Sequence, residues 1–352
     1  MLNRISIVQE CDATAVERGT NADYMNKKLL LLVGFMFVYL VAFTQNYPKQ
    51  IVVAKDGSGN YTTIQAAVDA LRAYSPQHNV VMIKNGVYHE KVTIPAWVTN
   101  VTFKGENKDS TVVVWEDFSG KFLNADTIMS KRKMTTFNSY TLNVQGNDVT
   151  IENLTIKNAA GRVGQAVALH VDGDRFCMYN CNILGNQDTL LVANDGSRQY
   201  YIRCFIEGTT DFIFGGATAI FDACTIHCLS NSYITAASTS AWQKFGFVFL
   251  NCKITANNEC KKEFLGRPWR AFAKVVFMNC DLGNHILPEG WHNWNNAENE
   301  STAFFAEYNN TGEGAKTNKR VKWSYQLSDK QARKYTIQQI FKSWIPVYNQ
   351  FI

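Results

Sequence analysis

A short phrase of alternating apolar and polar residues recurs along the middle of the chain. Its copies are IENLTI, MYNCNI, YIRCFI, FDACTI, FLNCKI and FMNCDL, ending at Ile156, Ile183, Ile206, Ile226, Ile254 and Leu282. The steps between copies are 27, 23, 20, 28 and 28 residues, so a constant core alternates with loops of variable length. This pattern predicts one short strand per phrase, with its apolar residues inward, in the successive coils of an all-β parallel β-helix.

Cysteine fills the same place in five of these phrases, at Cys181, Cys204, Cys224, Cys252 and Cys280. A free cysteine behaves as a small apolar residue, so we expect an interior stack that needs no special chemistry. Disulfides between neighbours remain open in an oxidising compartment. Cys177 and Cys228 lie four residues from Cys181 and Cys224, but no second pair of cysteines or histidines completes a zinc-binding pattern. We therefore expect no metal site.

Helical patterns lie at both ends of this ladder. Residues 62–74 alternate as an amphipathic helix, and Ser328 is placed to N-cap a second helix over residues 329–341. Their apolar faces consist of Ile64, Ala67, Val68 and Leu71 in the first helix and of Ala332, Tyr335, Ile337 and Ile340 in the second. We expect short capping helices on the ends of a single solenoid domain over residues 45–352.

The N-terminal region has the order of a signal peptide. Lys27 and Lys28 precede an apolar run from Leu29 to Phe43, and a polar stretch follows. The run is short for a membrane span, which needs about 20 apolar residues. We predict a signal peptide over residues 25–44, translation that starts at Met25, and an N-terminal extension over residues 1–24. The alternative is an uncleaved N-terminal anchor.

Composition adds only mild constraints. The 352 residues include 46% hydrophobic and 18% charged residues, which is ordinary for a globular protein with a sizeable core. The formal net charge of +5 would suit an acidic partner. No basic run stands out, so we expect no nucleic-acid partner.

Two lone aspartates lie in otherwise uncharged stretches, GNQDTLL over residues 185–191 and GTTDFIFGG over residues 208–216. Asp188 and Asp211 are one repeat apart, and in register their backbones would be about 4.8 Å apart on neighbouring parallel strands. Two carboxylates this close cannot both ionise cheaply, so one is pushed to keep a proton. The pair can supply an acid and a nucleophile from one residue type.

Aligning QAVAL (165–169) with these two segments places Gln165, Gln187 and Thr210 in one column. Glutamine amides can donate hydrogen bonds to the oxygen that becomes negative during ester hydrolysis. The G-x-S-x-G motif of serine hydrolases is absent from the sequence. The structural alternative is an amide ladder beside aspartates that cap turns.

The chain resembles the pectin methylesterases, which are right-handed parallel β-helices. Over about residues 49–346 it carries family-like segments in family order, including QAVAL, GNQDTLL, GTTDFIFGGA, LGRPW and GWHNW. The resemblance is to bacterial-type members, which lack the long inhibitory pro-region of plant members. It implies an exported enzyme, without metal or organic cofactor, that is periplasmic, at the cell surface or secreted.

The resemblance also implies residue roles. Asp211 would attack the methyl-esterified galacturonate of pectin, and Asp188 would protonate the departing methanol and then activate water. Gln165 and Gln187 would stabilise the oxyanion, and Arg267 of LGRPW would keep Asp211 charged, since a nearby guanidinium lowers a carboxyl pKa. Trp269, Trp291 and Phe212 would contact the sugar chain. The enzyme is expected to act as a monomer with no stable membrane span after signal cleavage.

Two departures from the family pattern bear on specificity. After YITA the chain reads ASTSAWQ over residues 237–243, where members commonly have a polar segment, so the cleft wall is expected to differ. The loop over residues 116–136 resembles no family segment. Two alternatives therefore remain: a β-helix esterase for another ester and a solenoid that only binds polysaccharide. The calcium-binding acidic clusters of pectate lyases and the aspartate arrangement of polygalacturonases are not visible in the sequence.

Overall fold

The computed structural model describes residues 23–34, 36, 47–123 and 132–346. The chain divides into two units, Met1–Pro48 and Lys49–Ile352. In the first unit, residues 23–34 form a helix with exposed side chains. Across the described residues, no helix combines the length and apolar character needed to cross a membrane. The rest of the predicted signal peptide and N-terminal extension lies outside the described residues.

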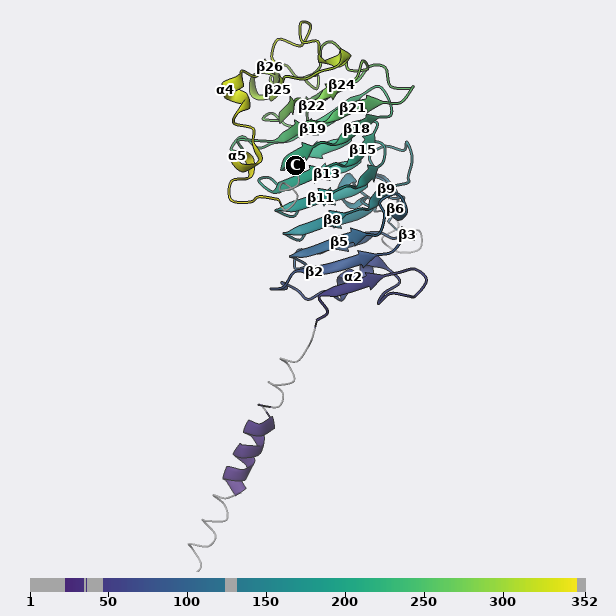
Figure 1. Cartoon of the computed structure of the whole chain (residues 1–352), viewed down its shortest axis with the longest axis vertical. Coiled ribbons are helices and arrows are strands. Elements are labelled where there is room, and N and C mark those ends of the chain that lie inside the picture. Colours follow the sequence, from purple (N-terminus) through teal and green to yellow (C-terminus); the bar gives the residue numbers. More distant parts are fainter. Residues whose placement is uncertain (1–22, 35, 37–46, 124–131, 347–352) are drawn as a thin grey trace, which may run out of the picture. The chain divides into compact units, whose positions relative to one another are not determined.

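The second unit is a stack of coils whose strands form three parallel sheets, which Figure 1 shows one above another in chain order. The 11-stranded sheet contains β1 (Gln50–Val53), β2 (Asn79–Ile83), β5 (Val101–Gly105), β8 (Val149–Glu152), β11 (Phe176–Tyr179), β14 (Arg198–Ile202), β17 (Thr218–Asp222), β20 (Phe247–Leu250), β23 (Lys274–Met278), β25 (Phe304–Tyr308) and β26 (Tyr325–Gln326). The eight-stranded sheet contains β3 (Gly86–His89), β6 (Thr111–Trp115), β9 (Thr155–Asn158), β12 (Asn182–Leu184), β15 (Phe205–Gly208), β18 (Thr225–Cys228), β21 (Lys253–Ala256) and β24 (Asp281–Leu282). The seven-stranded sheet contains β4 (Val92–Ile94), β7 (Leu142–Val144), β10 (Leu169–Val171), β13 (Leu190–Val192), β16 (Ile213–Gly215), β19 (Tyr233–Ala237) and β22 (Phe264–Pro268). The predicted right-handed parallel β-helix is confirmed.

The predicted register of the repeated phrase is confirmed in the eight-stranded sheet. Its last residues are successive strand partners, in the order Ile156, Ile183, Ile206, Ile226, Ile254 and Leu282. The prediction of one strand per phrase was wrong, because each phrase turns a corner. In MYNCNI, for example, the first residues end β11 and the last begin β12.

A left-handed residue makes each corner, directly before the cysteine or leucine of the phrase. Asn153, Asn180, Asn251 and Asn279 have φ values of +52° to +55°. Asparagine tolerates this conformation better than other residues with a Cβ, which explains its recurrence in the phrase. Arg203 in YIRCFI, with φ +52°, and Ala223 in FDACTI, with φ +50° and an exposed side chain, take the same place, so these two coils carry backbone strain that the asparagine corners reduce.

Replacing Ala223 with asparagine is expected to stabilise the protein by about 1 kcal/mol, because it relieves the cost of a left-handed alanine. For a domain of this size that corresponds to an increase in Tm of about 2–4 °C. Thermal unfolding followed by circular dichroism measures the shift. The matched control is Ala297→Asn, at an exposed alanine that is not left-handed. An equal increase in Tm for both variants would contradict the strain argument.

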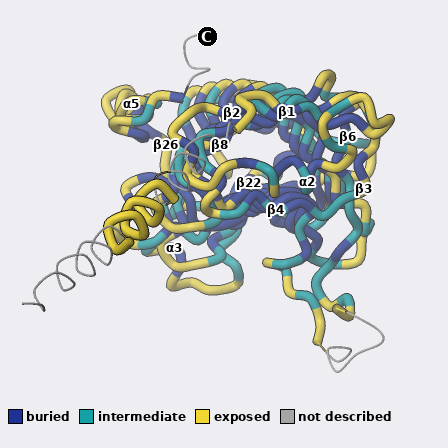
Figure 2. Tube along the Cα trace, turned by 90° about the horizontal axis from the view of Figure 1, so that it is seen from below, coloured by how far each residue is buried: buried dark blue, intermediate teal, exposed yellow. Residues whose placement is uncertain are grey.

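Stacked side chains fill the interior of the coils. Tyr201, Phe221, Phe249 and Phe277 are consecutive register partners, and their rings stack with centroid separations of 4.2–4.9 Å. The five phrase cysteines are buried beside this ladder, as predicted. The eight cysteines of the described region are free thiols, and burial raises the pKa of Cys181 to about 12. These thiols act as packing groups. Figure 2, a view along the stack, shows buried coil walls and exposed residues mainly on loops and short helices.

The helices agree only partly with the sequence prediction. The first is shorter than predicted, α2 (Ile64–Asp69), and places Ile64, Ala67 and Val68 in the main core. The second is two helices, α4 (Asp329–Ala332) and α5 (Ile337–Phe341), N-capped by Ser328 and Thr336. The remaining helical segments are α3 (Asn299–Thr302) and the 3₁₀ turns η2 (Thr136–Asn138) and η3 (Glu313–Ala315).

The expected end cap at the C-terminus was wrong in position. Residues of α4 and α5 pack on buried side chains of β11, β14, β17, β20 and β23, all in the 11-stranded sheet. Figure 1 shows both helices beside the stack rather than across its end. The two helices therefore bury their apolar faces against the outer face of the 11-stranded sheet.

Candidate active site

Two glycine-x-x-aspartate turns place the predicted acid pair between the eight-stranded and seven-stranded sheets. Asp188 lies between β12 and β13, and Asp211 lies between β15 and β16. Both are left-handed, with φ +63° and φ +49°. At Gly208 a Cβ would lie 2.2 Å from the Phe212 side chain, so the turn before Asp211 requires glycine. The repeated Gly and Asp in the sequence thus reflect one repeated corner.

Neighbouring coils bring the two glutamines beside the acids. Gln165 and Gln187 form a parallel bridge, as the alignment predicts, and the Asp188 N–H donates to the carbonyl of Thr210 at 3.0 Å. Four residues further on, Leu169 pairs with Leu190 instead of Leu191. The earlier coil therefore contains one extra residue, a bulge at Ala168 and Leu169, whose N–H groups both donate to the carbonyl of Thr189, at 2.8 Å and 3.2 Å. The gapless alignment of QAVAL was wrong at its end.

A bidentate ion pair fixes Asp211. Arg267, on β22, donates from Nε to Oδ1 at 3.0 Å and from Nη2 to Oδ2 at 2.7 Å. The guanidinium lies between the rings of Tyr233 and Trp294, at 3.9 Å and 3.7 Å from their centroids. Arginine suits this position because its planar fork matches a carboxylate while its faces stack on aromatic rings. Both oxygens of Asp211 are thereby held in one orientation.

Burial and mutual charge separate the two acids electrostatically. Burial raises the pKa of Asp188, and the charge of Asp211 raises it further, to about 8, against the opposing effect of Arg267. Burial also raises the pKa of Asp211 above its ordinary value, although hydrogen bonds and charge from Arg267 oppose it. The expected net lowering by Arg267 is therefore outweighed by desolvation. At neutral pH the pair holds its proton mainly on Asp188, and Asp211 is the anion.

These groups line one cleft of about 300 Å³. All five predicted polar residues are in its wall, together with the predicted aromatic Trp269. The amide groups of Gln165 and Gln187 make no hydrogen bond to another described side chain or backbone group, and both residues are partly exposed. The full lining consists of Thr136, Phe137, Gln165, Gln187, Asp188, Asp211, Phe214, Ala236, Arg267, Trp269 and Trp294.

Two aromatic predictions need correction. Trp291 is 1% exposed and packs on Phe305 at a centroid distance of 4.6 Å inside the coil. Phe212 is fully buried in the same core. Neither side chain reaches the cleft, so both are packing residues. Trp294, three residues after Trp291 in the same GWHNW segment, lines the cleft instead.

Of the two segments that depart from the family pattern, one contributes to the cleft wall and the other does not. Thr136, the last residue of the unusual loop, lines the cleft with its neighbour Phe137, while residues 124–131 lie outside the described residues. The ASTSAWQ segment was expected in the cleft wall. None of residues 237–243 lines it, and Trp242 and Gln243 line a different cavity. The ASTSAWQ segment therefore lies outside the wall of the cleft that holds Asp188 and Asp211.

Comparison with known proteins agrees with this geometry. A family model described as Pectinesterase matches residues 50–343. The chain is 39% identical over 288 residues to Pectinesterase 31 of Arabidopsis thaliana, covering 81% of this chain and 89% of that protein. The family match over residues 50–343 includes every strand from β1 to β26.

Solved structures show the same likeness. A pectin methylesterase from carrot superimposes with a TM-score of 0.75 at 35% identity, over 82% of this chain and 92% of its own. A mutant pectin methylesterase in complex with a hexasaccharide gives a TM-score of 0.73 at 30% identity, over 86% and 99%. From its family match and these relatives, the chain belongs to the pectinesterase family.

Proposed function

We propose that this protein hydrolyses the methyl esters of galacturonate residues in pectin, releasing methanol and leaving pectate. The observation that carries the proposal is the arrangement of Asp211, clamped by Arg267, beside a protonated Asp188 and two glutamine amides in one cleft. Ester hydrolysis needs a nucleophile, an acid and oxyanion donors, and each is supplied by one of these groups.

In the first half of the reaction, an Asp211 oxygen attacks the ester carbonyl carbon. The carbonyl oxygen becomes negative, and the amides of Gln165 and Gln187 donate hydrogen bonds to it. As the tetrahedral intermediate collapses, the C–O bond to the methoxy group breaks, and Asp188 gives its proton to the departing methanol. The products are methanol and an anhydride between Asp211 and the galacturonate.

In the second half, the roles of the carboxyls follow from the first. Asp188, now ionised, takes a proton from a water molecule, whose oxygen attacks the galacturonyl carbon of the anhydride. The bond to Asp211 breaks and the free galacturonate carboxyl is released. Asp188 ends protonated and Asp211 ends as the anion held by Arg267. Both groups have therefore returned to the protonation states that their surroundings favour.

The biological setting extends the proposal. Trp269 lines the cleft and is proposed to contact the sugar chain, with Trp294 beside the Arg267 guanidinium. The order of lysines, apolar run and polar stretch over residues 25–44 supports export by a signal peptide.

Assignment to the bacterial-type members and action as a monomer stay predictions, as do the start at Met25 and the single domain over residues 45–352.

The test is methanol release from highly methylated pectin by the purified chain from Gln45 onward. We expect methanol and free carboxylate in equal amounts, because each hydrolysed ester yields one of each. Acetyl esters on a neutral polysaccharide serve as the comparison substrate. A folded protein that released no methanol from pectin, while cleaving another ester, would contradict the proposed substrate.

A further inference from the structure

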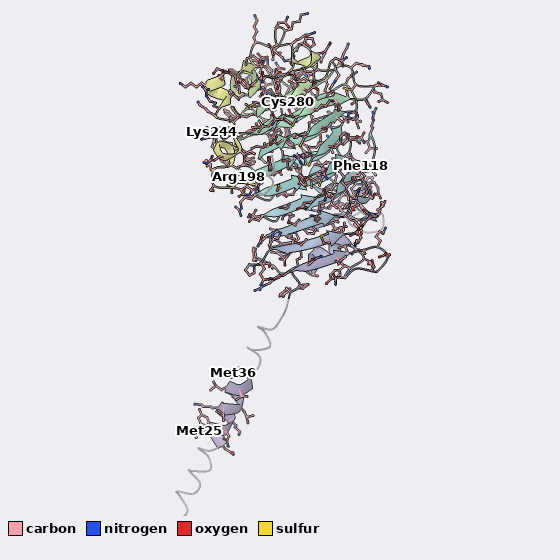
Figure 3. The ribbon with its side chains drawn as sticks, in the orientation of Figure 1. Met25, Met36, Phe118, Arg198, Lys244 and Cys280 are labelled. Carbon is pink, nitrogen blue, oxygen red and sulfur yellow. The ribbon has the colours of Figure 1, made fainter. Side chains whose placement is uncertain are left out.

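A second cavity, of about 580 Å³, lies beside α5 and shares no lining residue with the catalytic cleft. Its walls come from α5, from the start of β14 and from the loop over residues 238–246 between β19 and β20. Figure 3 shows Arg198 and Lys244 on this same flank of the stack, next to α5. The cavity is therefore a separate concave site in the size range of ligand pockets.

An exposed tryptophan stands at this cavity. Trp242 is 70% exposed, and the backbone of Gly196 lies against its ring, since a Cβ there would meet the indole at 2.6 Å. The loop that carries it is pinned at three points. Gln243 donates to the carbonyl of Gly216 at 2.8 Å, Ser240 bonds to Asp195, and Thr239 accepts from the backbone of Lys274 at 3.1 Å. A large aromatic surface is thus presented to solvent on an ordered loop, as in preorganised binding sites.

The charge around the cavity favours an anionic ligand. Arg198 is already paired with Asp174, at 2.6 Å, and donates to the carbonyl of Phe341. Lys244 has no ion pair with any described residue, and its ammonium group lies 5.1 Å from the centroid of the Phe245 ring. A second lysine, Lys342, also lines the cavity without a described ion pair. Two cations are therefore left for a ligand to neutralise.

Neutral hydrogen-bonding groups complete the surface. The exposed glutamines of α5, Gln338 and Gln339, line the cavity, and their side-chain amides make no hydrogen bond to other described residues. An amide both donates and accepts, so it suits the hydroxyl groups of a sugar. An aromatic face, two unpaired cations and free amides are together the chemistry that recognises an acidic sugar chain.

We propose that this cavity binds a de-esterified stretch of galacturonan, the polymeric product of the reaction. The proposal rests on the proposed function, which supplies the polymer. A pyranose ring stacks on Trp242, while carboxylates on neighbouring sugars pair with Lys244 and Lys342. Methyl-esterified sugars lack those charges, so the site discriminates product from substrate. The enzyme is thereby held on regions of the polymer that have already lost their methyl groups.

The experiment compares the parent chain with Trp242→Ala and Lys244→Gln. Affinity electrophoresis in polygalacturonate should show Kd raised about tenfold by Trp242→Ala and about threefold by Lys244→Gln, as expected for loss of one anchor contact and one exposed charge. Added salt should reduce the effect of Lys244→Gln. Trp97→Ala, at a tryptophan that is 53% exposed and outside the cavity, is the matched control and should bind like the parent.

Kinetics on two substrates provide an independent readout. With long, partly de-esterified pectin, Trp242→Ala should raise KM and leave kcat unchanged. With a short, fully methylated oligomer, kcat and KM should match the parent. If the parent releases no methanol but polygalacturonate binding still depends on Trp242, the binding proposal stands and the proposed reaction fails.

Three results would overturn the second site. The first is unchanged polygalacturonate binding by both variants. The second is an equal loss of binding, caused by Trp242→Ala, for a neutral polysaccharide and for polygalacturonate, which would remove the role of charge. The third is loss of a dimer in Trp242→Ala without any change in polymer binding, measured by light scattering, which would assign the cavity to self-association.

Discussion

Replacing Asp211 with asparagine is expected to lower kcat/KM for methanol release by about 10⁴-fold or more, since loss of a catalytic nucleophile removes a step that nothing else in the cleft performs. Asparagine has the same size and leaves one oxygen to accept from Arg267, which now donates to Asp211 at 2.7–3.0 Å. The loss would therefore report missing nucleophilicity rather than a rearranged cleft. Initial rates on highly methylated pectin measure it.

The matched control is Asp222→Asn, because Asp222 is another buried carboxyl whose pKa is raised by burial. It accepts from Tyr200 at 2.9 Å and from Asn251 at 3.2 Å, outside the catalytic cleft. Activity should stay within about twofold of the parent, as expected for a site that shares no partners with the cleft. If Asp211→Asn kept about 1% of parent activity after a check for deamidation, Asp211 would not be the nucleophile.

The sequence predicts the register of this fold well because the repeat is carried by core residues. Ile183 and Ile206 must both point inward, so variable loops between them do not alter their pairing. The acid pair follows from the same register, since Asp188 and Asp211 precede equivalent strands. Local backbone conformation was harder to predict, because a left-handed Asn180 splits an apparently continuous strand phrase into two sheets.

Side-chain direction outside the repeat was not predictable from spacing. Trp291 and Trp294 are in one short segment, but Trp291 bridges to Gly266 and points into the coil. Trp294 follows it with φ +62° and lies over the guanidinium of Arg267. Nothing in GWHNW distinguishes the two without the turn geometry. The amphipathic pattern after Ser328 likewise predicts an apolar face without identifying which surface it covers.

Asp188→Asn is expected to lower kcat by about 10²–10⁴-fold, the range in which a positioned general acid contributes. The amide cannot give a proton to methanol or take one from water, so both halves of the reaction lose their proton carrier. The parent should show the complementary pH dependence. Its kcat/KM should fall about tenfold per pH unit above an apparent pKa of about 8, as Asp188 loses its proton.

On the acid side, activity should fall as Asp211 gains a proton. Burial raises the pKa of Asp211, so this limb should lie above the ordinary carboxyl value of 3.8. In Asp188→Asn the alkaline limb near pH 8 should disappear from the residual activity, because the group that titrates there is gone. Persistence of that limb in the variant would assign the titration to another group.

Stability supplies a test of Asp188 that does not depend on catalysis. The carboxyl titrates at about 8 when folded and has an ordinary pKa of 3.8. Between these values the folded protein holds a proton that the unfolded chain has released, so the contribution of Asp188 to stability falls as pH rises. Below about pH 4 that contribution is fully present, and above about pH 8 it has been lost and stays constant.

Asparagine does not titrate, so the Tm of Asp188→Asn minus that of the parent should grow from pH 4 to pH 8 and then level off. The ionised Asp211 nearby adds to this difference, because the parent must hold two like charges together at high pH. Parallel Tm profiles for the two proteins would mean that Asp188 ionises normally in the folded state. In that case the cleft would lack a proton donor at neutral pH, and the proposed division of roles between the two acids would be wrong.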